Sequence, residues 1–155
     1  MRAMGSDSRQ DVTIQIRRVL VDEVVDLRHE VLRQGLPRDS AIFAGDHDTE
    51  SRHYGAFQGH RLIGCATLHK NPWQDEPAWQ LRGMAVAHSH RGAGVGRQLL
   101  DFLESDVRAG SALRLLWANA RVPALAFYEK LGWRVVSDVF DIPTAGPHRK
   151  IFRQL

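Results

Sequence analysis

The feature that most constrains how this chain can fold is a glycine-rich stretch, RGAGVG, at residues 91–96. A largely apolar segment at residues 79–86 precedes it, and apolar residues at helical spacing follow it to residue 108. This order predicts a strand, a tight turn and a helix. The glycines carry no Cβ atoms, and the first turn of a helix leaves N–H groups unpaired at the positive end of its dipole. We therefore expect a phosphate or pyrophosphate site here, with Arg91 as an added cation.

The spacing of the glycines restricts which phosphate-bearing ligands can be expected. It does not fit GxxxxGK[ST], so a nucleotidase of the P-loop type is not expected. It does not fit GxGxxG either, because Arg97 occupies the position of the last glycine. The alternative is a left-handed turn that only links the strand to the helix.

The composition is that of one soluble domain. The chain has 155 residues, of which 43% are hydrophobic and 25% are charged, proportions typical of globular proteins. No apolar run approaches the roughly 20 residues needed to span a bilayer, and the first residues lack the apolar region of a signal peptide. The single cysteine, Cys65, excludes an intramolecular disulfide and a multi-cysteine zinc site. We expect a cytoplasmic protein with no membrane partner.

The charge is mildly positive, with 21 Lys+Arg against 18 Asp+Glu and a formal net charge of +3. The charges are dispersed along the chain, and no block of five or six like charges occurs. This pattern favours a solvated basic surface over a nucleic-acid groove, so no nucleic-acid partner is expected.

The hydrophobic pattern predicts one α/β domain over residues 12–155, after a flexible lead at residues 1–11. Alternating or continuous apolar runs predict strands, and apolar residues at helical spacing predict helices. Gly35, Gly110 and Gly132 are suited to ending the helices. Strands are predicted at residues 12–19, 52–57, 61–69, 79–86, 113–118, 133–140 and 148–155, and helices at residues 21–35, 95–108 and 123–131.

Several segments resemble the GNAT superfamily of N-acetyltransferases. Residues 91–96 match its R/Q-x-x-G-x-G/A motif, and Asn119 with ALAFYEKLGW at residues 124–133 is similar to its "N…A…FY…GF" segment. Residues 27–32 and 142–148 resemble the ElaA-like branch. The resemblance implies a mixed, mostly antiparallel sheet that is flanked by helices and splayed between its fourth and fifth strands.

The resemblance also implies acetyl-CoA as co-substrate and no metal. The pantetheine arm would pair like a strand with Met84, Ala85 and Val86, and Asn119 would bond the arm or a buried water. Gly83 would form the bulge that begins the splay, or would serve only for packing. The residues around the pyrophosphate would be Arg91, Gly92, Ala93, Gly94, Val95, Gly96 and Arg97.

The family's general acid corresponds to Tyr128, whose phenol would protonate the departing thiolate. The backbone N–H of Val86 or a neighbour would stabilise the oxyanion. Tyr128 also has an ordinary interpretation as a core residue beside Phe127. If Phe127 packs inward, Tyr128 is free to face the cofactor.

The general base is not evident. Several family members have a glutamate where this chain has Gln80, which cannot accept a proton but could position a water. Glu76, Asp141 and His148 are the remaining candidates, and each could equally be a solvated loop residue. His148 suits a base or proton relay, since the ordinary pKa of histidine is about 6.5.

Other polar and aromatic residues favour structural roles. His88 and His90 flank Ser89, but no third metal ligand or triad member stands at supporting spacing. Trp73 and Trp79 bracket a loop near the expected acceptor cleft, or cap the core.

The expected acceptor side consists of residues 28–33, residues 36–50 and the C-terminal loop through His148. Within it, Asp39, Asp46, Asp48 and Glu50 would suit a cationic amine, or form a solvated loop.

The predicted activity is transfer of an acetyl group from acetyl-CoA to a primary amine of a small molecule or protein, by direct attack in a ternary complex. The alternative is a non-catalytic acyl-CoA-binding sensor or partner module with the same fold. The protein is expected to be a monomer or a homodimer.

Overall fold

One mixed sheet of eight strands forms the centre of the computed structural model, which describes residues 13–155. The strands run in the order β1-β2-β3-β4-β5-β8-β6, and β7 pairs with β8. Every pair is antiparallel except β4 and β5. The strands are β1 (Ile14–Val19), β2 (Arg52–Gln58), β3 (Arg61–Lys70), β4 (Trp79–Val86), β5 (Leu115–Arg121), β6 (Arg134–Val135), β7 (Phe140–Ile142) and β8 (Gly146–Gln154).

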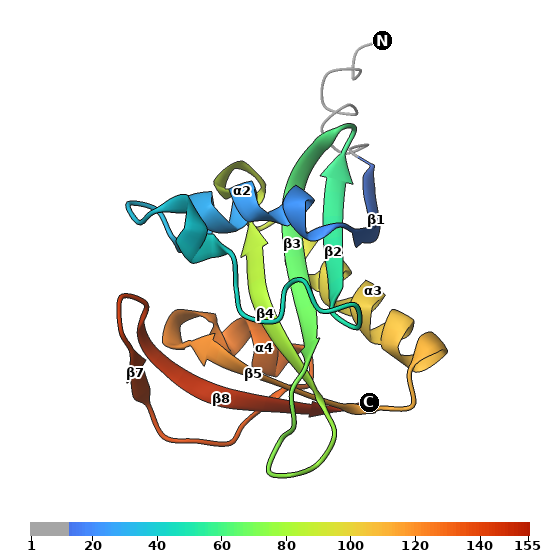
Figure 1. Ribbon diagram of the computed structural model, residues 1–155, viewed down its shortest axis with the longest axis vertical. Coiled ribbons are helices and arrows are strands. Elements are labelled where there is room, and N and C mark those ends of the chain that lie inside the picture. The colour runs from blue at the N-terminus through green and yellow to red at the C-terminus, as the bar shows by residue number, and fades with distance from the viewer. Residues whose placement is uncertain (1–12) are drawn as a thin grey trace.

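Helices cover both faces of this sheet. Figure 1 shows α2 in front of β2, β3 and β4, and α3 behind them. The helices are α2 (Val21–Leu32), α3 (Val95–Gly110) and α4 (Leu125–Lys130), with short 3-10 turns at η1 (Arg38–Ala41), η2 (His88–His90) and η3 (Val122–Ala124). The predicted single α/β domain is therefore confirmed over the described residues. The predicted lead at residues 1–11, and Val12 of the first predicted strand, lie outside them.

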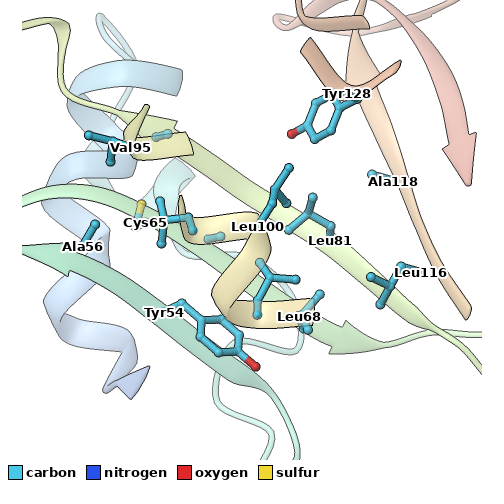
Figure 2. Close-up of a cluster of buried hydrophobic side chains, with 14 of the residues drawn as sticks. Tyr54, Ala56, Cys65, Leu68, Leu81, Val95, Leu100, Leu116, Ala118 and Tyr128 are labelled. Carbon is cyan, nitrogen blue, oxygen red and sulfur yellow. The ribbon is translucent and has the colours of Figure 1, made fainter. Parts of the chain in front are cut away.

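Core side chains lie on both faces of the sheet, where Val24 and Leu27 come from α2 and a longer row comes from α3. Val95, Leu99, Leu103 and Val107 are fully buried at intervals of four residues, which places them on one face of the helix. Burying each such side chain contributes about 1.5–3 kcal/mol. Figure 2 shows side chains from the strands gathered around Leu100, with Tyr128 at the margin of the cluster.

The two parallel strands separate soon after they meet. Only Trp79 with Leu116 and Gln80 with Trp117 are paired between β4 and β5, and the strands then part (Figure 1). Gly83 has a φ of 60° and lies where the register between β3 and β4 shifts, so a bulge begins the separation. The predicted splay is confirmed.

Some predicted boundaries were wrong. The strand predicted at residues 133–140 is two short strands, β6 and β7, because the Ser137 hydroxyl accepts the backbone N–H of Lys150 in β8. A side chain thus replaces a backbone partner, and the ladder is interrupted. β5 begins at Leu115 and extends to Arg121, since β8 pairs with it through His148. The helix predicted from Pro123 begins as the 3-10 turn η3, and α4 ends at Lys130.

Candidate functional site

A cavity of about 530 Å³ occupies the gap between β4 and β5. Its walls come from both strands, from the end of α2, from Tyr128 of α4 and from the turn between β7 and β8. Pockets at a break in a sheet are common ligand sites. The lining residues used below are Arg33, Phe43, Gln80, Arg82, Gly83, Met84, Ala85, Val86, Arg91, Asn119, Arg121, Tyr128 and His148.

The predicted phosphate turn leads from the end of β4 into α3. Gly92 and Gly94 have φ values of 77° and 83°, which a residue with a side chain rarely adopts. A Cβ at Gly92 would meet no atom within 4 Å, so this part of the backbone is open to a ligand. Gly96 has a different reason to be glycine, because a Cβ there would lie 3.0 Å from the Phe127 ring. Arg91 and Arg97 are both exposed, and of the two only Arg91 lines the cavity.

The edge of β4 facing the gap is available for pairing. Beyond Gln80 this edge has no partner strand within the described residues, and Met84, Ala85 and Val86 line the cavity. An amide-bearing chain could therefore hydrogen-bond to this edge as a strand would. The open turn and the open edge together fit the pantetheine and pyrophosphate of acetyl-CoA.

Tyr128 lies in the cavity wall and is also part of the core. It is 7% exposed and packs edge-on against Phe127 and Trp133. Burial raises the pKa of its phenol above the ordinary value, so the hydroxyl keeps its proton. Tyr128 was expected to face the cofactor if Phe127 packed inward, and that condition is not met. Phe127 is 36% exposed, and its ring lies against Gly96.

His148 is buried in β8, opposite Arg121 of β5. Its Nδ1 lies 2.7 Å from the carbonyl oxygen of Gly146. Because a carbonyl can only accept, Nδ1 donates, and the lone pair of the neutral ring is on Nε2. Asn119 lines the same cavity, and its Oδ1 accepts a hydrogen bond of 2.9 Å from Lys150 Nζ.

Gln80 is buried in the cavity wall, where its Oε1 accepts a hydrogen bond of 2.9 Å from Asn71 Nδ2. Glu76 and Asp141 are exposed and do not line the cavity. Of the predicted candidates for the base, only His148 is brought to the cavity.

A buried ionic network supports the cavity wall from behind. Fully buried Arg28 donates to both carboxylate oxygens of Asp46, at 2.6 and 3.1 Å, and to the Thr67 hydroxyl at 2.6 Å. His53 joins through Thr67 at 2.8 Å and through the Asp46 carbonyl at 2.9 Å. Burial would raise the pKa of Asp46, but hydrogen bonds from Arg28 and the Phe43 N–H outweigh it and hold that pKa below its ordinary value. Burial lowers the pKa of His53.

Two interpretations were open for the acidic residues of the loop, contact with a cationic amine or a solvated surface, and the cavity does not support the first. Asp46 is turned inward to Arg28, and Asp39 is exposed on η1. Asp48 and Glu50 line a separate hollow, where Glu50 pairs with Lys70 at 2.8 Å. None of the four lines the cavity.

Arg33 lies in the expected acceptor segment at residues 28–33, whereas sequence reasoning missed Arg82 and Arg121. All three line the cavity wall. They come from the end of α2, from β4 and from β5. No spacing in the sequence relates them, so only the known order and pairing of the strands could have indicated their meeting.

The remaining candidates have structural roles. His90 bonds to Gln58 at 2.7 Å and to Ser89 at 2.8 Å. Over residues 13–155 there is no group of three side chains that could hold a metal ion, and no helix there has the length and apolar character to cross a membrane. Burial raises the pKa of the Cys65 thiol to about 12. Trp79 is buried, and Trp73 packs on Trp117 with ring centroids 5.6 Å apart.

The chain has clear similarity to known proteins. Residues 18–133 match the Acetyltransferase (GNAT) family. Uncharacterized N-acetyltransferase YitI of Bacillus subtilis (strain 168) is 30% identical over 92% of this chain and 97% of its own length.

Solved structures are similar in fold. Escherichia coli ElaA has a TM-score of 0.75 at 21% identity, covering 92% of this chain and all of its own. An aminoglycoside 6'-N-acetyltransferase complexed with coenzyme A has a TM-score of 0.73 at 18% identity, covering 90% of this chain and 96% of its own.

Proposed function

The chain belongs to the acetyltransferase (GNAT) family and is an acetyl-CoA-dependent N-acetyltransferase, and from this premise we propose how its residues carry out the transfer. The observation that carries the proposal is the parting of β4 and β5 around a cavity that Tyr128 lines. The acceptor is a primary amine that attacks the donor directly within a ternary complex.

In this proposal the donor lies along the open edge of β4. Backbone groups of Met84, Ala85 and Val86 hold the pantetheine, and Asn119 contacts it from β5. Residues 91–97 surround the pyrophosphate with backbone N–H groups at the start of α3, where the helix dipole is positive. Bound acetyl-CoA supplies the acetyl group as a thioester.

The amine must be neutral when it attacks. A primary alkyl amine has a pKa of about 10.4, so most of it is protonated at neutral pH. We assign removal of the proton to His148, whose Nε2 carries the lone pair when Nδ1 donates to Gly146. Gln80 positions a water in the same wall.

Two further groups complete the step. The nitrogen–carbon bond forms as the amine attacks the thioester carbonyl, and the Val86 N–H stabilises the negative oxygen. The carbon–sulfur bond then breaks, and Tyr128 donates its proton to the leaving thiolate. Burial raises the pKa of the phenol, so Tyr128 enters the step protonated. The proton that the attacking nitrogen loses as the amide forms returns the phenolate to phenol.

Initial rates measured against both substrates test direct transfer. Varying acetyl-CoA at several amine concentrations should give intersecting double-reciprocal lines. Parallel lines, together with an acetylated protein isolated in the absence of amine, would mean a covalent intermediate and would contradict the proposal.

The non-catalytic sensor is less well supported, because the chain and YitI share the N-acetyltransferase family over most of their lengths.

A further inference from the structure

The cavity wall is cationic on the side of α2. Arg33, Arg82 and Arg121 all line it, while no aspartate or glutamate of residues 13–155 does. A cavity that receives an amine would be expected to carry carboxylates if the rest of the acceptor were cationic. The charge of this wall therefore bears on the chemical class of the acceptor.

Two shared contacts bring the three arginines together. Nη1 of Arg33 and Nη2 of Arg121 each donate to the carbonyl oxygen of Leu32, both at 3.1 Å. The guanidinium carbons of Arg33 and Arg82 lie 5.1 and 5.3 Å from the centroid of the Phe43 ring. We refer to Arg33, Arg82 and Arg121 as the arginine cluster.

Within residues 13–155 the arginine cluster has no direct ion-pair partner, although the charge of Asp46 acts on Arg82 and opposes the burial that lowers its pKa. Among the described residues, no carboxylate lies within 4.0 Å of any of the three guanidinium groups, although Arg28 behind them is paired with Asp46. Burial, followed by the charges of Arg121 and Arg28, lowers the pKa of Arg33. Each guanidinium has five N–H groups, and the protein contacts above occupy one on each of Arg33 and Arg121. An anion in the cavity would find several donors and would relieve the repulsion.

The cluster is on a different side of the cavity from the phosphate turn. The Arg33 guanidinium donates to the Leu32 carbonyl at the end of α2. The Arg82 guanidinium donates at 2.7 Å to the carbonyl of Ala44, which lies in the loop after that helix. The turn at residues 91–94 instead precedes α3, which covers the opposite face of the sheet (Figure 1). Arg91 is the cavity arginine beside that turn.

We propose that the acceptor is a small primary amine that also bears a carboxylate, such as an amino acid, and that the arginine cluster binds this carboxylate. The inference rests on the proposed function and specifies the substrate of the same site. Arg33 and Arg121 both donate to the Leu32 carbonyl oxygen, so their guanidinium groups are close enough to bind one carboxylate together. The bound anion directs the amine of the same molecule toward the gap between β4 and β5.

Matched pairs of acceptors test the proposal. A panel of α-amino acids, β-alanine and 4-aminobutyrate is assayed beside the neutral amide of each, with spermidine and kanamycin as polycationic amines. N-acetylated product and released CoA are both measured. We expect kcat/KM for at least one acid to exceed that of its amide by about tenfold or more, as charge-assisted hydrogen bonds would give.

Variants connect this preference to the cluster. Arg33→Ala and Arg121→Ala should each lower kcat/KM for the acid by about 10- to 100-fold and for the amide by much less. Arg33→Lys should recover part of the loss, and the KM for acetyl-CoA should stay the same. Arg108→Ala removes an exposed arginine of α3 and serves as the matched control.

Equilibrium binding gives a second measurement that does not need turnover. The N-acetylated acids should bind to the enzyme–CoA complex more tightly than their amides, and Arg33→Ala should remove the difference.

Each contrary result has a distinct meaning. Amides or polycationic amines used as well as the acids would overturn this inference and leave the N-acetyltransferase function standing. A raised KM for acetyl-CoA, or equal losses on acid and amide in the arginine variants, would also overturn it. If CoA binds but no amine is acetylated, the proposed function fails, and the binding comparison still decides whether the cluster recognises a carboxylate.

Discussion

At the scale of single residues, the two tyrosines of the chain have opposite surroundings. Tyr54 donates to Asp106 at 2.6 Å in the core, whereas the Tyr128 hydroxyl has no hydrogen-bond partner among the described residues and lies in the cavity wall. Tyr128→Phe should lower kcat by about 10²- to 10⁴-fold, the range for a lost general acid, with little change in melting temperature or CoA affinity.

Tyr54→Phe provides the matched control. It should lower the melting temperature and leave kcat unchanged, because Tyr54 does not line the cavity. Equal losses of turnover and CoA affinity in Tyr128→Phe would instead make Tyr128 a structural contact.

His53 makes stability depend on pH. Burial lowers its folded pKa below the unfolded value of about 6.5, so the folded protein binds this proton less readily than the unfolded chain. The contribution is complete above pH 6.5 and is lost as the pH falls toward the folded pKa. The melting temperature should therefore fall between pH 7.5 and 5. His53→Gln should be less stable at neutral pH and should show a flatter profile, and an unchanged slope would contradict this assignment.

The position in the site could be predicted from the sequence for some residues and not for others. Tyr128 and the glycines of the phosphate turn lie within short motifs, so the residues themselves indicated their place. The arginine cluster and the inward turn of Asp46 depend on contacts between residues far apart in sequence. Asp46 meets Arg28 across 18 positions, and no local pattern distinguishes it from a solvated loop carboxylate.

At the scale of elements, the bulge in β4 positions the open edge. A Cβ at Gly83 would lie 2.7 Å from Arg28 Nε and 3.2 Å from the Phe43 ring. Gly83→Ala should therefore destabilise the protein by about 1–3 kcal/mol or more, through backbone strain and this collision. Chemical denaturation measures the loss.

Gly59→Ala separates the two causes. Gly59 has nearly the same φ, 61° against 60°, and nothing lies within 4 Å of a Cβ there. The stability lost in Gly59→Ala should reflect backbone strain alone, so it should be smaller than the stability lost in Gly83→Ala. Equal losses would show that the contact with Arg28 is unimportant.

The turn before α3 carries a prediction about the donor. Gly94→Glu places a negative charge among the N–H groups expected to hold the pyrophosphate, and CoA affinity should fall by at least about 100-fold. Gly94→Asn is the control, since asparagine tolerates the left-handed backbone and adds no charge. Calorimetric titration with CoA measures both, and unchanged affinity in Gly94→Glu would refute this placement of the pyrophosphate.

Elements with their own periodicity were predictable. The segment of β4 is largely apolar, and that of α3 repeats apolar residues at helical spacing. Both elements lie close to the predicted boundaries. The break between β6 and β7 was not predictable, because it arises where Ser137 meets the backbone of Lys150 from a strand that comes later in the chain.

At the scale of the whole molecule, one sheet provides both a core and a gap. β3 pairs with β4 and β8 pairs with β5, and both pairings are antiparallel, so each strand is held in place where the two separate. In our proposal, α3 lies beside the donor, and the end of α2 lies beside the acceptor. The net charge of +3 did not indicate that three arginines of the cavity wall have no carboxylate as an ion-pair partner among the described residues.

The most direct test of this account is the stoichiometry of the reaction itself. Purified protein, acetyl-CoA and the acceptor panel should give released CoA and N-acetylated amine in equal amounts, with both products strongly reduced in Tyr128→Phe. CoA binding by the wild-type protein without any N-acetylated product from any amine would contradict it.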